Sequence, residues 1–260
     1  MLKIDITKWT CICKNLPYEF KKTKILHISD LHNKLFGNNQ AFLIDIIKKI
    51  KPSFIFITGD LIDEKSLDIR NTLELLEGII TLAPVYYVTG NHEWLRRNRS
   101  RELFLYMEKK GINVLHDKAL TIYRGNSSIQ IMGIDDPYKW VACGEYNKKT
   151  YIKRYIETLN QMQKQKRGKF TILLAHRPEF IRHYSKNGID LVFAGHAHGG
   201  MIRIPHIGGL IAPHQGLLPR YTEGIIKNRN TSLIISRGLG DSGIPLRINN
   251  NPELVVVYLE

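Results

Sequence analysis

Short apolar runs rich in β-branched residues recur along the chain, and most of them lead directly into polar residues. Runs of this length and composition are typical of buried strands, and six fall at residues 24–29, 54–58, 85–89, 129–133, 170–175 and 191–194. Between them lie amphipathic helical patterns at residues 40–50, 67–82, 101–110, 151–163 and 179–187. Alternation of strand and helix predicts an α/β fold.

Two further strands are expected at residues 232–236 and 253–259, where they would complete a second sheet. No linker rich in proline or serine interrupts the 260 residues, so we expect one domain, 1–260, with an N-terminal extension at 1–23. Three cysteines form no disulfide framework, which indicates a reducing compartment. No secretion signal and no apolar run of about 18 residues is found, so a cytoplasmic or peripheral membrane location is expected. We also expect a monomer.

Five of the six predicted strands lead into a polar motif. Ligands in open α/β sheets gather beyond the carboxyl ends of the strands, so these motifs are expected to meet. Seven side chains in them would complete the ligand sets of two octahedral ions. Oxygen and imidazole donors without thiolate suit Mn, Fe, Zn or Mg ions. The motifs are Asp30-Leu31-His32, Gly59-Asp60-Leu61-Ile62-Asp63, Gly90-Asn91-His92-Glu93, Ala175-His176-Arg177 and Gly195-His196-Ala197-His198.

Each of these residues, taken alone, has a structural alternative. Asp30 and Asp60 could be helix N-caps, His176 a hydrogen-bonded core histidine, and Asn91 a turn residue. These alternatives do not explain why all the motifs follow predicted strands. The joint pattern therefore favours a metal site.

The order, spacing and flanking glycines resemble the calcineurin-like metallophosphoesterase superfamily, whose pattern is D-x-H, G-D-x-x-D, G-N-H-E/D, a lone H, and G-H-x-H. The resemblance implies a four-layer α/β/β/α sandwich. It also implies a dinuclear centre at the strand carboxyl ends, bridged by Asp60. One ion would be bound by Asp30, His32 and His198, and the other by Asn91, His176 and His196.

The reaction implied is hydrolysis of a phosphodiester or pyrophosphate by direct attack of a hydroxide that bridges two divalent ions, with manganese the first candidate. His92 would stabilise the phosphoryl oxygen or protonate the leaving group. Asp63 would hold His92 through a ring N–H, or else serve as a helix cap.

Glu64 and Lys65 follow Asp63, where protein serine/threonine phosphatases carry Arg-Gly, and this difference argues against that class. Purple acid phosphatases carry a tyrosine at the position that Asp63 occupies in this chain, which argues against that class too.

Residues 28–33 and 236–247 resemble most closely the bacterial membrane-associated metallophosphoesterases of the UDP-2,3-diacylglucosamine hydrolase type. A lipid-linked substrate is therefore expected. The alternatives are a soluble phosphodiesterase acting on nucleotides or nucleic acid, and a catalytically silent metal-binding scaffold. No stacking-aromatic array or nucleic-acid motif supports the nucleic-acid alternative.

Charge and one long loop extend this hypothesis. Lys and Arg number 38 against 24 Asp and Glu, a formal net charge of +14, which favours polyanionic partners such as an anionic membrane surface. Residues 199–224 form a loop unusually long for a compact domain. We expect it to be an apolar rim whose Arg203 and Arg220 bind substrate phosphate, or else a loop buried on the second sheet. The basic run at residues 96–101 could steer anions toward the metals.

Overall fold

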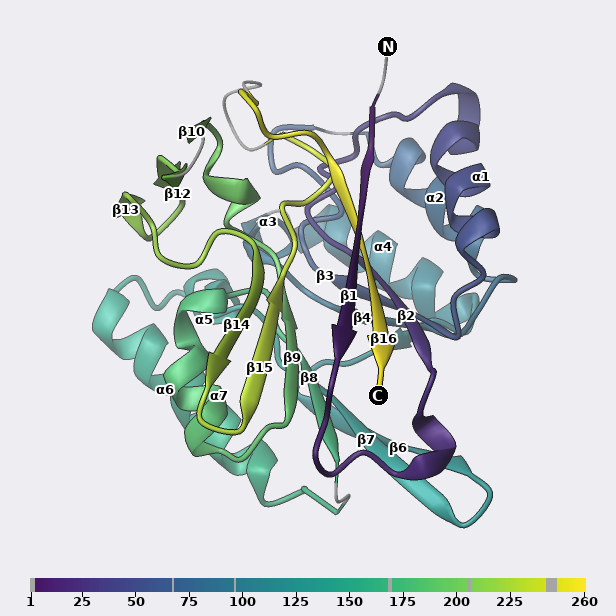
Figure 1. The fold of residues 1–260 in the computed structure, drawn as a ribbon. Coiled ribbons are helices and arrows are strands. Elements are labelled where there is room, and N and C mark those ends of the chain that lie inside the picture. Colours follow the sequence, from purple (N-terminus) through teal and green to yellow (C-terminus); the bar gives the residue numbers. More distant parts are fainter. Residues whose placement is uncertain (1–2, 67, 96, 168–169, 205–206, 242–246) are drawn as a thin grey trace.

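The computed structural model describes residues 3–66, 68–95, 97–167, 170–204, 207–241 and 247–260, and the side chains of residues 97–99 are also outside the description. Two six-stranded sheets pack face to face, and helices cover their outer faces (Figure 1). The predicted α/β architecture is confirmed.

The first sheet contains the strands that precede the first three motifs. Strands β2 to β5 run parallel, β16 is antiparallel to β2, and β1 is parallel to β16. The order is β1 (Asp5–Cys11), β16 (Glu253–Leu259), β2 (Lys24–Ile28), β3 (Phe54–Thr58), β4 (Val85–Val88) and β5 (Asn113–Val114).

The C-terminal strand was expected in the second sheet, and this expectation is wrong. β16 lies in the first sheet, between β1 and β2. Its residues alternate between two apolar environments: Leu254 and Val256 face the helices, and Val255 and Val257 face the other sheet. A strand buried on both faces suits this interior position. Part of the expected N-terminal extension forms edge strand β1.

The second sheet supplies the last two motifs. β15, β9, β8 and β7 run parallel, and antiparallel strands close both edges. The order is β14 (Gly224–Asn228), β15 (Thr231–Ile235), β9 (Leu191–Ala194), β8 (Thr171–Leu174), β7 (Ser127–Gly133) and β6 (Lys118–Arg124).

Three apolar clusters define the four layers. One lies between the sheets and includes Phe56 and Phe193. A second lies under helices α1 (Ala41–Ile50), α2 (Arg70–Ile79) and α4 (Arg97–Lys109), and a third lies under α6 (Lys148–Gln163) and α7 (Ile181–Lys186). Figure 1 shows these two helix groups on opposite sides of the sheets. The predicted α/β/β/α sandwich is confirmed.

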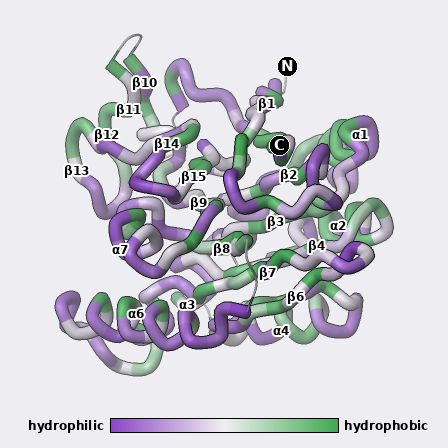
Figure 2. Tube along the Cα trace, turned by 60° about the horizontal axis from the view of Figure 1, so that its bottom comes forward, coloured by the Kyte–Doolittle hydropathy of each residue, from purple (hydrophilic) through white to green (hydrophobic). Residues whose placement is uncertain are grey.

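Helix α6 illustrates how the sequence selects one buried face. The Asn147 side chain caps its start by accepting the N–H groups of Lys149 and Thr150. Buried residues then recur at helical spacing, and most of the other residues of the helix are hydrophilic (Figure 2). The buried residues are Tyr151, Tyr155, Leu159 and Met162.

Short elements complete the described chain. Helices α3 (Asn91–Leu95) and α5 (Tyr138–Ala142) follow β4 and β7, and 3-10 turns occur at Tyr18–Phe20, Asn38–Gln40, Pro178–Phe180 and His198–Gly200. The long loop contains two hairpins, β10 (Arg203–Ile204) with β11 (Gly208–Gly209), and β12 (Ile211–Ala212) with β13 (Gly216–Leu217). The described helices are all too short or too polar to span a bilayer.

Candidate metal centre

The five motifs meet where strand ends of the two sheets face each other. β2, β3 and β4 of the first sheet lead into the motifs of Asp30, Asp60 and Asn91. β8 and β9 of the second sheet lead into those of His176 and His196. Because parallel strands end at the same edge, the fold brings together residues more than 160 positions apart in sequence, as His196 and Asp30 show.

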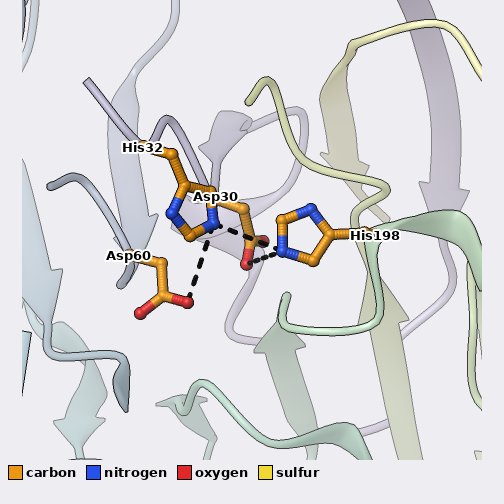
Figure 3. Close-up of side chains that lie close together, drawn as sticks. All are labelled: Asp30, His32, Asp60 and His198. Atoms are coloured by element: carbon orange, nitrogen blue, oxygen red, sulfur yellow. Dashed lines mark hydrogen bonds and ion pairs between the residues drawn. The ribbon is translucent and has the colours of Figure 1, made fainter. Parts of the chain in front are cut away.

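One group of potential ligand atoms comprises Asp30, His32, Asp60 and His198. Their ligand atoms lie within 4.8 Å of one another, and all four residues are buried. His198 Nε2 lies 3.4 Å from Asp30 Oδ1, and His32 Nε2 lies 3.8 Å from Asp60 Oδ2. Figure 3 shows the four side chains pointing toward one another.

A second group comprises Asp60, His176 and His196, also buried and within the same distance of one another. His176 Nε2 lies 3.2 Å from Asp60 Oδ2 and 3.1 Å from His196 Nδ1. The opposite ring nitrogen of His176 lies 2.6 Å from the Thr58 carbonyl, which fixes the ring and leaves Nε2 available to an ion. Asp60 belongs to both groups, as a bridging carboxylate requires.

Asn91 adds an unused acceptor beside these groups. Its Oδ1 is buried and has no hydrogen-bond partner among the described residues. A buried carbonyl oxygen normally finds a donor, so this orphan acceptor fits a metal ligand. The next residue, His92, donates its backbone N–H to Asp60 Oδ1 at 2.9 Å and so ties Asn91 to the shared carboxylate.

The electrostatics of the groups also suit cations. Burial raises the pKa of Asp30 to about 6. Burial disfavours the His176 imidazolium, but Asp60 and Asp30 outweigh it and raise the His176 pKa to about 10. Burial lowers the pKa of His32 to about 4, which keeps that ring in its neutral, ligating form. The two buried carboxylates therefore require compensating positive charge, which divalent ions would supply.

The backbone of the motifs is held in an unusual conformation. Five of the seven predicted ligands have positive φ, although none is glycine, and each such residue costs about 1–3 kcal/mol. Conformations of this kind persist where the surrounding structure imposes them, and they cluster at functional sites. The five are Asp30 (φ 51°), His32 (47°), Asp60 (52°), His196 (67°) and His198 (46°).

Two motif glycines permit close approach to the carboxylates. A Cβ atom on Gly90 would lie 2.1 Å from Asp60 Oδ1, and one on Gly195 would lie 2.3 Å from Asp30 Oδ2. Both distances are shorter than any real contact of a Cβ atom. These two positions therefore require glycine as long as Asp30 and Asp60 keep their places.

Glu93, for which no role was predicted, holds the Asp60 loop in place. Its buried carboxylate accepts the backbone N–H groups of Gly90 (2.7 Å), Asp60 (2.9 Å) and Leu61 (2.8 Å). The sequence feature that could have indicated this role is the position of the Glu93 carboxylate, directly after Asn91 and His92 in the same motif. Its hydrogen bonds depend on the packing of two separate loops.

His92 lies beside the centre, but Asp63 does not form the predicted hydrogen bond to its ring. The Nε2 atom of His92 is 3.9 Å from Asp60 Oδ2, and its Nδ1 is 4.0 Å from Asp63 Oδ1. The latter distance is too long for the predicted hydrogen bond. The backbone N–H of Glu64 donates to His92 Nδ1 at 3.1 Å instead, and Asp63 Oδ1 accepts the Lys65 N–H at 2.8 Å.

The predicted substrate-binding arginines do not converge on the two groups in this structure. Arg203 forms an ion pair with Glu223 and donates to the Gly199 carbonyl at 2.9 Å. Arg220 is exposed, and its guanidinium lies over the Tyr221 ring. The basic run at 96–101 lies largely outside the described residues.

A different arginine reaches the centre. Arg177 is buried, pairs with Asp136 at 2.5 Å, and places Nη1 2.8 Å from His196 Nε2. Asp136 follows β7, the one strand of the predicted six that carried no recognised motif. The sequence feature that could have indicated this ion pair is the acidic pair Asp135-Asp136 after β7. The partner, Arg177, became evident only from the fold.

Two buried carboxylate–histidine groups that share one aspartate, at the ends of strands from two packed sheets, define a dinuclear metallohydrolase site. The chain belongs to the calcineurin-like phosphoesterase family, whose pattern matches residues 23–200. It is therefore a hydrolase that acts on phosphoester bonds and carries a dinuclear divalent metal site.

Relatives agree with this assignment. The metallophosphoesterase YkuE of Bacillus subtilis is 28% identical over 99% of this chain and 86% of its own length. A metallophosphoesterase of Aquifex aeolicus is 26% identical over 99% of this chain and 92% of its own length. The phosphopantetheinyl hydrolase PptH of Mycobacterium tuberculosis superimposes with a TM-score of 0.51 at 13% identity, covering 83% of this chain and 89% of its own, and supports the fold alone.

Proposed function

We propose that the protein hydrolyses a phosphodiester or pyrophosphate bond with two divalent ions, manganese being the first candidate. The observation that carries the proposal is the sharing of Asp60 between the two ligand groups. Asp30, His32 and His198 would bind one ion, Asn91, His176 and His196 the other, and Asp60 both. When bound, two such ions neutralise phosphoryl charge and lower the pKa of a water molecule.

His92 supplies a proton donor next to the reacting group. Because Nδ1 accepts the Glu64 N–H, the proton of the neutral ring is on Nε2, the atom that faces Asp60. An Nε2–H at this position can donate to a phosphoryl oxygen or to the leaving group. Asp63, 4.0 Å from Nδ1, would act on His92 through its charge and not through a hydrogen bond.

A lipid-linked substrate is favoured by the surface beside the centre. The β11 and β12 hairpin strands pack against His198–Gly200, and apolar side chains of the same segment are exposed. Figure 1 shows β10, β12 and β13 projecting from the sandwich. The chain also has a net charge of +14, which attracts anionic lipid surfaces. Arg220, exposed in this segment, remains a candidate for binding substrate phosphate.

The experiment that tests the substrate is a comparison of initial rates with Mn²⁺ on four compounds: a phosphomonoester, an aryl phosphodiester, a cyclic nucleotide and a lipid-linked pyrophosphate. We expect hydrolysis of the aryl phosphodiester and a higher kcat/KM on the lipid-linked pyrophosphate. A preference for the cyclic nucleotide would favour the soluble nucleotide phosphodiesterase. Absence of turnover on all four would contradict the proposal and favour a silent scaffold.

A further inference from the structure

The two ring nitrogens of His196 face different neighbours. Nδ1 lies 3.1 Å from His176 Nε2, within the group that contains Asp60. Nε2 points away from this group, toward Arg177 and His214. A neutral imidazole carries one proton and binds a metal through the other nitrogen. His196 can therefore bind an ion through Nδ1 only when its proton is on Nε2.

Arg177 does not suit that protonation state. A guanidinium has only N–H donors, so Arg177 Nη1, 2.8 Å from His196 Nε2, can bond that nitrogen only when it carries no proton. The proton would then be on Nδ1 and would block the metal. Arg177 is also fixed by two bonds to Asp136, at 2.5 and 3.2 Å, and cannot change into an acceptor.

His214 offers what Arg177 cannot. Its Nδ1 lies 2.9 Å from His196 Nε2, and its Nε2 lies 3.2 Å from the Tyr138 hydroxyl. With its own proton on Nε2, His214 donates to Tyr138 and accepts the Nε2–H of His196 through Nδ1. A group that accepts the N–H of the ring nitrogen away from the metal fixes the tautomer and orientation of a metal-binding histidine.

The geometry points to His214 as a positioning residue that holds His196 in its metal-binding tautomer. The inference rests on the proposed function, which makes His196 a ligand. His214 lies between β12 and β13, in the segment that carries the exposed apolar side chains. The hairpin proposed to meet a lipid surface thus also contacts one of the two ion sites.

Two substitutions at position 214 isolate the acceptor. The backbone there has a φ of 59°, which both glycine and asparagine tolerate. His214→Gly removes the acceptor, whereas His214→Asn retains an oxygen near the position of Nδ1. His183→Asn, on α7, controls for the loss of a histidine elsewhere. His214 is exposed and lies outside the apolar core, so we expect each variant to fold, and thermal unfolding of each is measured in parallel.

The measurement is equilibrium dialysis of metal-stripped protein against Mn²⁺ alone. We expect two ions in the wild type and in His214→Asn and His183→Asn. In His214→Gly we expect one ion with unchanged affinity and a second weakened by about tenfold, the lower end for such partners since water can replace the acceptor. Unchanged binding of both ions by His214→Gly, equal weakening of both, or equal loss in His214→Asn would overturn the proposal. Two tightly bound ions without phosphoesterase activity would refute the proposed function and leave this inference intact.

Discussion

The carboxylate of Glu93 holds the main chain of Asp60, because its Oε2 accepts the Asp60 N–H at 2.9 Å while Oε1 accepts the Leu61 N–H at 2.8 Å. An amide at position 93 must turn one NH2 group toward these donors. Glu93→Gln should therefore shift Asp60 and reduce metal affinity by about 10–100-fold, the usual effect of losing such a supporting bond. Mn²⁺ dialysis measures this directly.

Glu157→Gln, on the outer helix α6, is the matched control and should bind Mn²⁺ as the wild type does. The Glu93 variant should also lose stability, by about 1–3 kcal/mol for an unsatisfied buried donor or acceptor. Wild-type metal binding by Glu93→Gln would show that Asp60 keeps its position without the carboxylate.

Metal binding and chemistry should separate at His92 and Asp60. His92→Ala should retain both ions and lose turnover by about 100-fold or more, because a positioned proton donor contributes on that scale. Asp60→Asn should instead lose metal, since the amide cannot serve both ligand groups. Metal analysis together with kcat on an aryl phosphodiester distinguishes the two. Loss of metal from His92→Ala would make His92 a ligand and refute the role given to it.

Stability at acid pH should depend on His27, which is not one of the ligands. Burial lowers the pKa of His27 to about 3, so the folded ring is neutral while the unfolded ring gains a proton below pH 6.5. The contribution of neutral His27 to the free energy of unfolding is complete above pH 6.5. It declines as the pH falls toward 3, by up to about 1.4 kcal/mol per pH unit. Urea unfolding of metal-free protein between pH 7 and 4 measures it.

His27→Gln should flatten this dependence, because glutamine does not titrate and can still reach the Thr58 hydroxyl that His27 Nε2 contacts at 2.8 Å. Other histidines add to the wild-type slope, so the quantity compared is the difference between the two slopes. Identical slopes would show that His27 is protonated without cost in the folded protein.

The exposed apolar side chains of the hairpin segment should mediate membrane contact. Ile207, Ile211, Leu217 and Leu218 are 64, 42, 73 and 66% exposed, which favours the rim over a loop buried on the sheet. Replacing all four with serine should weaken co-sedimentation with anionic vesicles at low salt, because apolar insertion and basic charge act together. Activity on a lipid-linked substrate should fall while activity on an aryl phosphodiester is retained.

The control replaces two exposed apolar residues elsewhere, Ile12 and Leu105, which are 79 and 58% exposed. This variant should sediment with vesicles as the wild type does. If the wild type ignores vesicles, or the rim variant loses both activities equally, the segment has a structural role only.

The sequence predicted some elements to the residue and misplaced others for physical reasons. β3 and β9 have the expected bounds, because both are continuous apolar runs that end at a glycine-containing motif. The partner of β16 could not be predicted, since an apolar strand fits either sheet and its pairing with β2 spans most of the chain. β1 was missed because its exposed alternate residues leave only a weak signal.

The candidate site was more predictable than the contacts that support it. Ligand motifs have local spacing, and the structure brings six of the seven predicted ligands into two groups that share Asp60. Glu93 and Arg177 act through hydrogen bonds to residues in other loops, so their roles depend on tertiary packing. The Asp63–His92 hydrogen bond was predicted because Asp63 lies three residues after Asp60, but the backbone N–H of Glu64 contacts that ring nitrogen instead.

Titration of metal-stripped protein with Mn²⁺, with hydrolysis of an aryl phosphodiester followed at each step, tests the central claim most directly. Stripped protein should be inactive, and activity should rise to a plateau as two ions bind per chain, because the two ligand groups share Asp60. Full activity with one ion, activity that survives complete removal of metal, or two bound ions without hydrolysis would contradict the account.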